Sequence, residues 1–216
     1  AARLAGMPHV VNAFAGLGHI FADEDRAGWL RQFVKLAFRW LLKNQGRVIV
    51  QNPDDLRVLQ DSGAITPGQA ALIRGSGVDL DRFHPRPEPA GMPIVVLAAR
   101  LLWDKGVGEF VAAAEDLKRA GVGARFVIVG EPDPENHSSI QVDQLAIWRD
   151  AGFVECWGKR ADMPEVLAGC HIVCLPSYYG EGVPKILLEA AAAGRPIVTT
   201  DTPGCREVVS EGENGL

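Results

Sequence analysis

The sequence lacks an uninterrupted apolar stretch long enough to cross a lipid bilayer, and no signal peptide is recognised in it. It also lacks an excess of positive charge, because its net charge of −5 argues against a general nucleic-acid-binding surface. A hydrophobic content of 47% excludes a largely disordered chain. We therefore expect a cytoplasmic globular protein, and 216 residues are enough for one large or two small α/β domains.

Cysteine and histidine are sparse and show no pattern of metal ligands. The four cysteines, Cys156, Cys170, Cys174 and Cys205, lie in or beside predicted strands and include no Cys-x-x-Cys pair. Buried, reduced thiols are the expected state, rather than disulfides or a zinc site. The five histidines are scattered along the chain, so the sequence predicts no metal and no bound cofactor.

Strand and helix patterns alternate from Pro93 onward, which predicts a parallel sheet with helices on both faces. Strands are expected at residues 94–99, 125–129, 153–157, 172–175 and 197–200. Helices are expected at 108–120, 141–151, 164–168 and 183–193, with a short one at 206–210. Ligands of such sheets bind beyond the carboxyl ends of the strands. The polar residues and glycines at that edge are Arg100, Glu131, Gly158, Lys159, Arg160, Ser177 and Glu181.

A shorter set of elements precedes this region. Strands are expected at 9–14, 47–52 and 71–74, and helices at 25–46 and 52–62, the latter with Asn52 as cap before Pro53. The prolines and glycine of 86–93 are typical of a linker. We expect a first domain over 1–77, a linker over 78–93 and a second domain over 94–216.

A strand, a glycine turn and a helix follow one another between His171 and Gly194. The apolar run at 172–175 predicts a buried parallel strand, and the alanine-rich helix is expected to end near Gly194. Pro184 suits the first helical turn, where its missing N–H is no loss. The free N–H groups of residues 182–185 are then expected to face the carboxyl edge of the sheet, where the helix dipole favours an anion.

Two carboxylates flank this expected anion site. Glu181 precedes the helix and Glu189 lies inside it. Carboxylates repel phosphate but accept hydrogen bonds from hydroxyl groups, so the combination predicts a ligand with both, such as a sugar nucleotide.

The motif that contains these glutamates carries a family resemblance. It reads Pro-Ser-x-x-Gly-Glu-Gly-x-Pro and continues, from Glu189, as Glu-Ala-x-Ala-x-Gly-x-Pro-Ile-Val. This string resembles the signature of retaining glycosyltransferases of family 4, the glycosyl transferases group 1, which have the GT-B fold of two Rossmann-like domains. The resemblance implies that 1–77 is the C-terminal part of an acceptor-binding domain and that 94–216 binds the nucleotide-sugar donor.

The resemblance also implies roles for individual residues. Family enzymes carry Gly-Arg-Leu-x-x-x-Lys-Gly after the first strand of the donor domain, and this chain matches it from Ala99 to Gly106 except for Ala99 itself. Arg100 and Lys105 would bind the diphosphate, and Glu181 the sugar hydroxyls. Glu189 would bind the ribose, and the backbone at Gly158, Lys159 and Arg160 the base. Other candidate donor-binding residues are Gly182, Val183, Pro184, Ser177 and Glu131.

The implied reaction is retaining transfer from a nucleoside diphosphate sugar, with UDP as the expected nucleotide. Catalysis would depend on Glu181, Arg100 and Lys105 together with the helix amides, without a metal ion or a protein nucleophile. Gly16, Gly18 and His19 lie in a segment similar to the Gly-Leu-Gly loop of family enzymes that extend polyprenyl-diphosphate-linked sugars, so they are acceptor-side candidates. A simple tight turn is the alternative. Many members have histidine where this chain has Ala15.

The predicted helix at 25–46 has two interpretations. Trp29, Phe33, Leu36 and Trp40 recur at helical spacing, and Arg31, Lys35, Arg39 and Lys43 form an adjacent stripe. The helix is either an ordinary core-facing helix with a basic solvent side or an interfacial helix. In the second case it touches the cytoplasmic face of a membrane, with its cations on anionic lipid or on a lipid diphosphate.

The function favoured by the resemblance is sugar transfer to a lipid-linked or glycan acceptor in surface polysaccharide synthesis. A nicotinamide oxidoreductase is a rival because of Gly106-Val107-Gly108, although the third glycine of that fingerprint is missing. A non-catalytic sugar-nucleotide-binding module is the other rival. The chain begins without methionine and stops where a strand is expected, which predicts a fragment that transfers no sugar alone.

Overall fold

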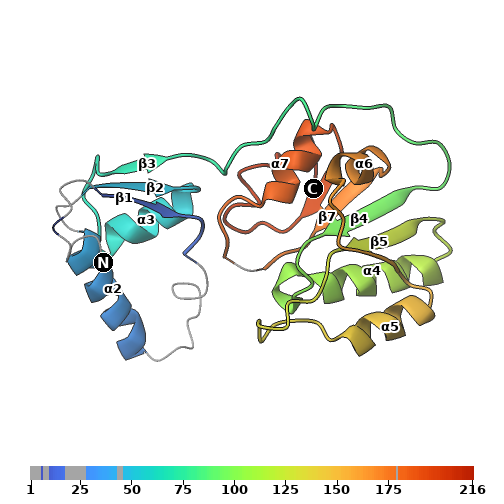
Figure 1. Ribbon diagram of the computed structural model, residues 1–216, viewed down its shortest axis with the longest axis horizontal. Helices are drawn as coiled ribbons and strands as arrows, with labels where there is room; N and C mark the ends of the chain where they lie inside the picture. The colour runs from blue at the N-terminus through green and yellow to red at the C-terminus, as the bar shows by residue number, and fades with distance from the viewer. Residues whose placement is uncertain (1–5, 7–9, 18–27, 43–45, 179) are drawn as a thin grey trace.

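The computed structural model of the chain describes residues 6, 10–17, 28–42, 46–178 and 180–216, except for the side chains of 28–32, 34 and 35. Figure 1 shows two lobes side by side, joined by the chain that follows β3. Each lobe is built on its own parallel sheet. The structure therefore agrees with the expected α/β class.

The first lobe has a three-stranded parallel sheet in the order β1-β2-β3. Its strands are β1 (Val11–Phe14), β2 (Arg47–Val50) and β3 (Ala70–Leu72), and its helices are α2 (Gly28–Leu42) and α3 (Pro53–Asp61). The side chain of Asn52 caps α3 as predicted, because its Oδ1 accepts a hydrogen bond from Asp55 N at 2.7 Å. The buried core of this lobe includes Val48, Val50 and Leu59.

The second lobe has a five-stranded parallel sheet in the order β6-β5-β4-β7-β8. The strands are β4 (Ile94–Ala98), β5 (Arg125–Val129), β6 (Glu155–Gly158), β7 (Ile172–Leu175) and β8 (Ile197–Thr199). The strand order reverses between β4 and β7, and sheets of this kind bind ligands beside such a reversal. The predicted strands are confirmed, with ends that differ by no more than two residues.

Helices cover both faces of this second sheet (Figure 1). They are α4 (Val107–Arg119), α5 (Val142–Asp150), α6 (Met163–Ala168) and α7 (Lys185–Ala192), and a short 3₁₀ helix, η1 (Trp103–Lys105), precedes α4. Successive residues of β4 point to opposite faces, so Val96 belongs to the core beneath α6 and α7 whereas Leu97 belongs to the core beneath α4. The sheet is buried on both sides, as its continuous apolar strands predict.

The last part of the chain between the two sheets, before β4, is hydrogen-bonded to the second lobe. Arg195 is buried and donates hydrogen bonds to the carbonyl oxygens of Arg86 and Leu167, at 3.0 and 2.9 Å. His171 bonds on both sides of its ring, since its Nδ1 accepts from Ile94 N at 3.0 Å and its Nε2 lies 2.9 Å from Pro89 O. The end of the linker is therefore part of the second lobe.

Two sequence predictions about helices need correction, and one short helix was not predicted. Residues 206–210 form hydrogen-bonded turns rather than a helix. The side chain of Asn214 accepts a hydrogen bond from Ser210 N and donates one to Val208 O, so these two backbone groups are not available for the hydrogen bonds within a helix. Helix α7 begins at Lys185, and Pro184 precedes it in an extended conformation (φ −62°, ψ 124°), so Pro184 is not in the first helical turn. The 3₁₀ helix η1 was not predicted, since three residues carry no periodic signal.

The described side chains of the apolar stripe predicted on α2 do not face the core. Phe33, Leu36 and Trp40 are more than half exposed, although Leu42 is buried and Phe38 packs edge-on against Phe14 at 5.6 Å. Helices in the described part of the chain are too short or too polar to cross a membrane. The interfacial interpretation is compatible with this exposure.

The cysteines are all free, but they are not all buried. Cys170 and Cys205 are buried, Cys174 is half-buried and Cys156 is exposed. Burial raises the pKa of Cys170 to about 11 and that of Cys174 to about 12. The expectation of buried thiols is wrong for Cys156, which lies on β6, an edge strand of the five-stranded sheet among the described residues.

Candidate functional site

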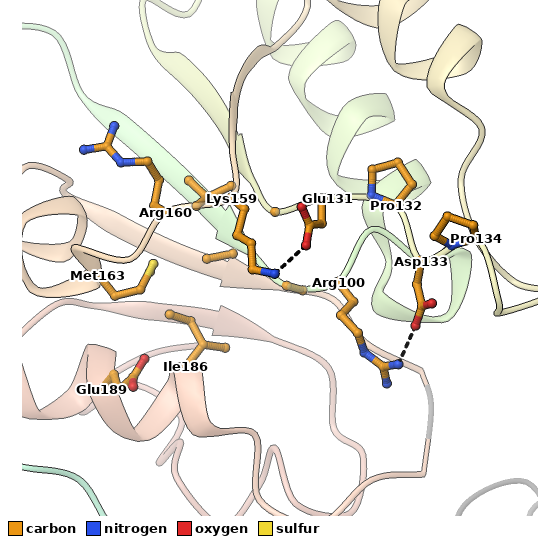
Figure 2. A pocket seen from close by; sticks show the side chains of 14 residues that line it. Arg100, Glu131, Pro132, Asp133, Pro134, Lys159, Arg160, Met163, Ile186 and Glu189 are labelled. Carbon is orange, nitrogen blue, oxygen red and sulfur yellow. Dashed lines mark hydrogen bonds and ion pairs between the residues drawn. The ribbon is translucent and has the colours of Figure 1, made fainter.

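A pocket of about 500 Å³ lies at the carboxyl ends of β4, β5 and β6 and reaches α7 (Figure 2). Its lining residues are Ala98, Ala99, Arg100, Val129, Gly130, Glu131, Pro132, Asp133, Pro134, Lys159, Arg160, Met163, Ile186 and Glu189. Five of these residues, Arg100, Glu131, Lys159, Arg160 and Glu189, were predicted from the sequence to belong to a donor site, and the structure brings them together. This volume is within the ordinary range for a small-molecule site.

Gly130 lets the loop after β5 lie close to the end of β4. Its φ is +147°, and a Cβ there would lie 1.9 Å from Ala99 O. Only glycine fits at this position. The segment that follows it, residues 131–134, lines the pocket. The segment is held there by a hydrogen bond from Asp133 N to Ser139 Oγ at 2.9 Å.

Ion pairs line the rim of the pocket. Arg100 Nη1 lies 2.9 Å from Asp133 Oδ2, and Lys159 Nζ lies 2.5 Å from Glu131 Oε1, as the dashed lines in Figure 2 show. Hydrogen bonding to Glu131 raises the pKa of Lys159. Both cations are largely exposed, at 63% for Arg100 and 73% for Lys159, so each pair contributes little to stability, and each cation can exchange its carboxylate partner for an anionic ligand.

Arg160, also on the rim, contacts both an acidic residue and an aromatic ring. Its guanidinium pairs with Asp162 at 2.5 Å and lies 5.9 Å from the ring centre of Trp157. Hydrogen bonding to Arg160 lowers the pKa of Asp162 to about 2. Gly158, just before these residues, has a φ of +66°, and its carbonyl accepts a hydrogen bond from Gly130 N at 2.9 Å.

Glu189 is the carboxylate in the inner wall. It is only 7% exposed, and its Oε1 lies 3.4 Å from Lys185 Nζ, one helical turn away. Ile186 and Met163 line the pocket beside it. A buried carboxylate beside apolar side chains is a strong hydrogen-bond acceptor for hydroxyl groups.

Lys105, Ser177 and Glu181 form a second cluster, at the ends of η1 and β7. Lys105 Nζ lies 2.5 Å from Glu181 Oε2, and Ser177 Oγ donates to Glu181 Oε1 at 3.2 Å. Gly106 makes the close approach possible, since its φ is +73° and a Cβ there would lie 2.1 Å from Pro176 O. The structure thus joins these three predicted site residues, but in a cluster separate from the residues that line the pocket.

The backbone N–H groups of residues 182 and 183 do not face an open anion site, which corrects the sequence prediction. Gly182 N donates to Ala15 O at 2.6 Å, and Val183 N donates to Gln51 Oε1 at 3.1 Å. Both acceptors belong to the first lobe. Pro184, the next candidate, has no N–H to offer.

The predicted acceptor-side residues are described only in part. Gly16 lies against the loop of the second lobe, because a Cβ on it would be 2.5 Å from Gly182 N. Gly18 and His19 lie outside the described residues. The segment 15–17 therefore does more than form a tight turn, since it contacts the second lobe.

Several residues of the site were missed by the sequence analysis. Asp133 was identifiable from the run Glu131-Pro132-Asp133-Pro134, whose prolines mark a loop directly after a strand. Met163 and Ile186 look like ordinary core residues in sequence and carry no other signal. Gln51 follows a strand of the first lobe, and nothing local indicates that it contacts residue 183.

The described residues contain no cluster of side chains suited to binding a metal ion. Among them, no group of three or more histidine, cysteine, aspartate or glutamate side chains is arranged to hold an ion. The metal independence expected from the sequence stays a prediction.

Comparison with protein families gives one match that covers more than half of the chain. Residues 92–216 match the model of the glycosyl transferases group 1. The matched region begins just before β4 and contains the whole pocket as well as the cluster of Lys105, Ser177 and Glu181.

Characterised relatives extend the similarity into the first lobe. The N,N'-diacetylbacillosaminyl-diphospho-undecaprenol alpha-1,3-N-acetylgalactosaminyltransferase of Campylobacter jejuni is 33% identical over all of this chain and 58% of its own length. The UDP-Gal:alpha-D-GlcNAc-diphosphoundecaprenol alpha-1,3-galactosyltransferase of Escherichia coli is 28% identical over 94% of the chain and 54% of its own length. The chain therefore spans little more than half the length of these relatives.

A solved structure shows the same fold. The complex of Anabaena HepE with UDP-glucose superposes with a TM-score of 0.77 at 20% identity, over 100% of this chain and 59% of that protein. The two lobes with parallel sheets are thus those of the GT-B fold.

Proposed function

The chain belongs to the glycosyl transferases group 1 family, and on that premise we propose that the protein transfers a sugar from a nucleoside diphosphate to a lipid-linked acceptor. The observation that carries the proposal is the pocket beyond the strand ends of the second lobe, with cations on its rim and one buried carboxylate in its wall. An anionic, hydroxyl-rich ligand such as a sugar nucleotide matches both features.

In this proposal the nucleoside occupies the pocket and its ribose hydroxyls donate to Glu189. Burial supports this role, since Glu189 is 7% exposed and its contact with Lys185 is long at 3.4 Å, so a hydroxyl group of the ligand would give the carboxylate a closer hydrogen-bond donor. The base lies near Gly158, Lys159 and Arg160, where the exposed cations and the backbone after β6 are available. Uracil is the proposed base, because both an enzyme relative and a structural neighbour are named with UDP-sugars.

The diphosphate is bound by Arg100 and Lys105. Arg100 offers a planar fork that can exchange Asp133 for phosphate oxygens, while Lys105 offers a point charge beside Glu181. Because Gly182 N and Val183 N bond to the first lobe, stabilisation of the leaving group depends mainly on these two side chains.

Glu181 accepts hydrogen bonds from the hydroxyls of the transferred sugar. Its carboxylate is fixed by Lys105 and Ser177, so its orientation does not depend on the substrate. The transfer proceeds with retention, without a protein nucleophile and without a metal. That stereochemistry and metal independence follow from the motif resemblance, and product analysis and activity in the presence of a chelator test them.

The acceptor is a polyprenyl-diphosphate-linked sugar in glycan or surface polysaccharide synthesis. Support comes from the names of the Campylobacter and Escherichia relatives, both of which act on undecaprenol-diphosphate-linked sugars. Such an acceptor lies in a membrane, and the exposed stripe of Phe33, Leu36 and Trp40 on α2, beside Arg39, suits contact with its cytoplasmic face. The first lobe, residues 1–77, is the acceptor side, and 78–93 is the linker to the donor side.

The test combines binding and turnover. Calorimetric titration with UDP-, GDP- and ADP-sugars should give the tightest binding for a UDP-sugar, and the full-length gene product should transfer a labelled UDP-sugar to a polyprenyl-diphosphate-linked saccharide. Binding without transfer would favour a non-catalytic sugar-nucleotide-binding module. Tighter binding of NADH than of any sugar nucleotide would contradict the proposal. The Glu181→Ala variant is the control for background turnover.

A further inference from the structure

The loop that carries Glu181 is clamped between the two lobes. Gly182 packs closely against the first lobe, because a Cβ on it would lie 2.1 Å from Gln51 Oε1 and 2.4 Å from Ala15 O. From the other side, a Cβ on Gly204 would lie 1.7 Å from Gly182 O. The backbone of residue 182 thus fills the space between the first lobe and the rest of the second lobe, and its position depends on both.

The side chain of Gln51 makes one of the contacts between the two lobes, at the boundary that we call the seam. Gln51 follows β2 in the first lobe, and its Oε1 accepts a hydrogen bond from Val183 N at 3.1 Å. A backbone N–H needs an acceptor, and the carboxamide accepts only through its oxygen, so this contact also fixes which end of the Gln51 side chain faces Val183. The bond joins residues 132 positions apart in the chain and is partly buried.

The contact lies two residues from Glu181. The carboxylate of Glu181 is held within the second lobe by Lys105 and Ser177, whereas the backbone just after it is held by Ala15 and Gln51 of the first lobe. A short loop anchored at both ends by different lobes has its position set by their relative placement. A shift of about 1 Å in a group that positions a substrate can lower a reaction rate about a hundredfold.

We propose that Gln51 is a positioning residue. By accepting a hydrogen bond from Val183 N across the seam, it holds the Glu181 loop at a defined position relative to the first lobe, and so aligns the donor's transferred sugar with the acceptor. This inference rests on the proposed function. It adds to the donor site a first-lobe residue outside the matched family region, which begins at residue 92. Gln51 itself need not touch the nucleotide.

Other cross-lobe pairs offer a matched control. Arg74 Nε lies 2.5 Å from Glu207 Oε2, and Arg206 Nη1 lies 3.2 Å from Asp54 Oδ2. Both pairs also join the two lobes, but neither includes a residue of the Glu181 loop. Loss of either pair weakens the seam without releasing Val183 N.

The experiment compares Gln51→Ala, Gln51→Glu and Arg74→Gln with the unmodified protein, all as the full-length gene product. Hydrogen exchange at the amide of Val183, measured without donor, should be faster in Gln51→Ala and unchanged in Arg74→Gln. Gln51→Glu should retain protection, since a carboxylate oxygen also accepts the bond. For the reaction, Gln51→Ala should lower kcat at least about tenfold while UDP affinity stays unchanged, and Gln51→Glu should restore part of kcat.

Two results would overturn the inference. One is unchanged exchange at Val183 in Gln51→Ala, which would mean that the side chain does not hold the loop. The other is a loss of kcat in Arg74→Gln equal to that in Gln51→Ala, which would mean that Gln51 only helps to hold the two lobes together and does not position the Glu181 loop. If the unmodified protein transfers no sugar at all, the proposed function fails, and the exchange measurement decides the loop contact by itself.

Discussion

Lys105 Nζ lies 2.5 Å from Glu181 Oε2, although 76 residues separate them in the chain. Their side chains are 13% and 19% exposed, so this is a largely buried ion pair at the junction of η1 and the loop after β7. Its two charges are those assigned to the diphosphate and to the sugar. The pair therefore holds the proposed catalytic groups in place before any ligand binds.

Removing the cation of this pair should destabilise the fold. Lys105→Met leaves the carboxylate of Glu181 without its ion-pair partner, and we expect a loss of about 1–3 kcal/mol in the free energy of unfolding. Urea denaturation measures it. The double variant Lys105→Met/Glu181→Gln should recover part of the loss. Arg119→Met, which removes an exposed pair with Glu115, should change stability by no more than about 0.5 kcal/mol.

Arg100→Ala should separate phosphate binding from nucleoside binding. If Arg100 binds the diphosphate, UDP affinity should fall by about 1.5–3 kcal/mol, the contribution of a hydrogen bond to a charged group, while uridine affinity stays the same. Isothermal titration calorimetry with both ligands gives the comparison. Arg119→Ala, remote from the pocket, serves as the control. Equal losses for uridine and UDP would refute the assignment.

The two glutamates should differ in what they recognise. Glu189→Gln should weaken UDP and a UDP-sugar alike, because ribose is common to both ligands. Glu181→Gln should spare UDP and weaken the sugar conjugate, since only the conjugate carries the hydroxyls that Glu181 accepts. Titration of both variants with both ligands measures this. The reverse pattern would show that the two roles are exchanged.

The basic stripe of α2 should bind anionic membranes. Replacing Arg31, Lys35 and Arg39 by glutamine should reduce co-sedimentation with phosphatidylserine vesicles, at about 1 kcal/mol per cation. The control is the same charge change on the second lobe, with Lys118, Arg119 and Arg149 replaced by glutamine. If the two triple variants bind vesicles equally, α2 is not the contact.

Gly106 should be far less tolerant of alanine than another glycine of similar conformation. Gly106 and Gly121 have φ values of +73° and +77°, but only at Gly106 would a Cβ meet backbone, 2.1 Å from Pro176 O. Gly121→Ala should cost about 1–2 kcal/mol for the left-handed conformation alone. Gly106→Ala adds the steric clash and should cost more. Chemical denaturation of both variants checks the order, and similar losses would contradict the packing argument.

Most of the secondary structure, and the sheet edge at which the site lies, could be predicted from local sequence patterns. Apolar runs place the five strands of the second sheet, and the residues that follow each run must lie at the carboxyl edge of a parallel sheet. Arg100, Glu131 and Lys159 were predictable for that reason. The motif around Glu181 identified the family before any geometry was available.

The partners of these residues could not be predicted in this way, because they follow from the packing of the folded chain. The Glu131 and Asp133 carboxylates neutralise the rim cations, Lys105 reaches Glu181, and Gln51 occupies the Val183 N–H that the sequence assigned to an anion. Local patterns specify conformation within a few residues, whereas these contacts join segments tens to more than a hundred positions apart. They depend on how loops cross the sheet edge and how the two lobes pack, and no periodicity in the sequence encodes that packing.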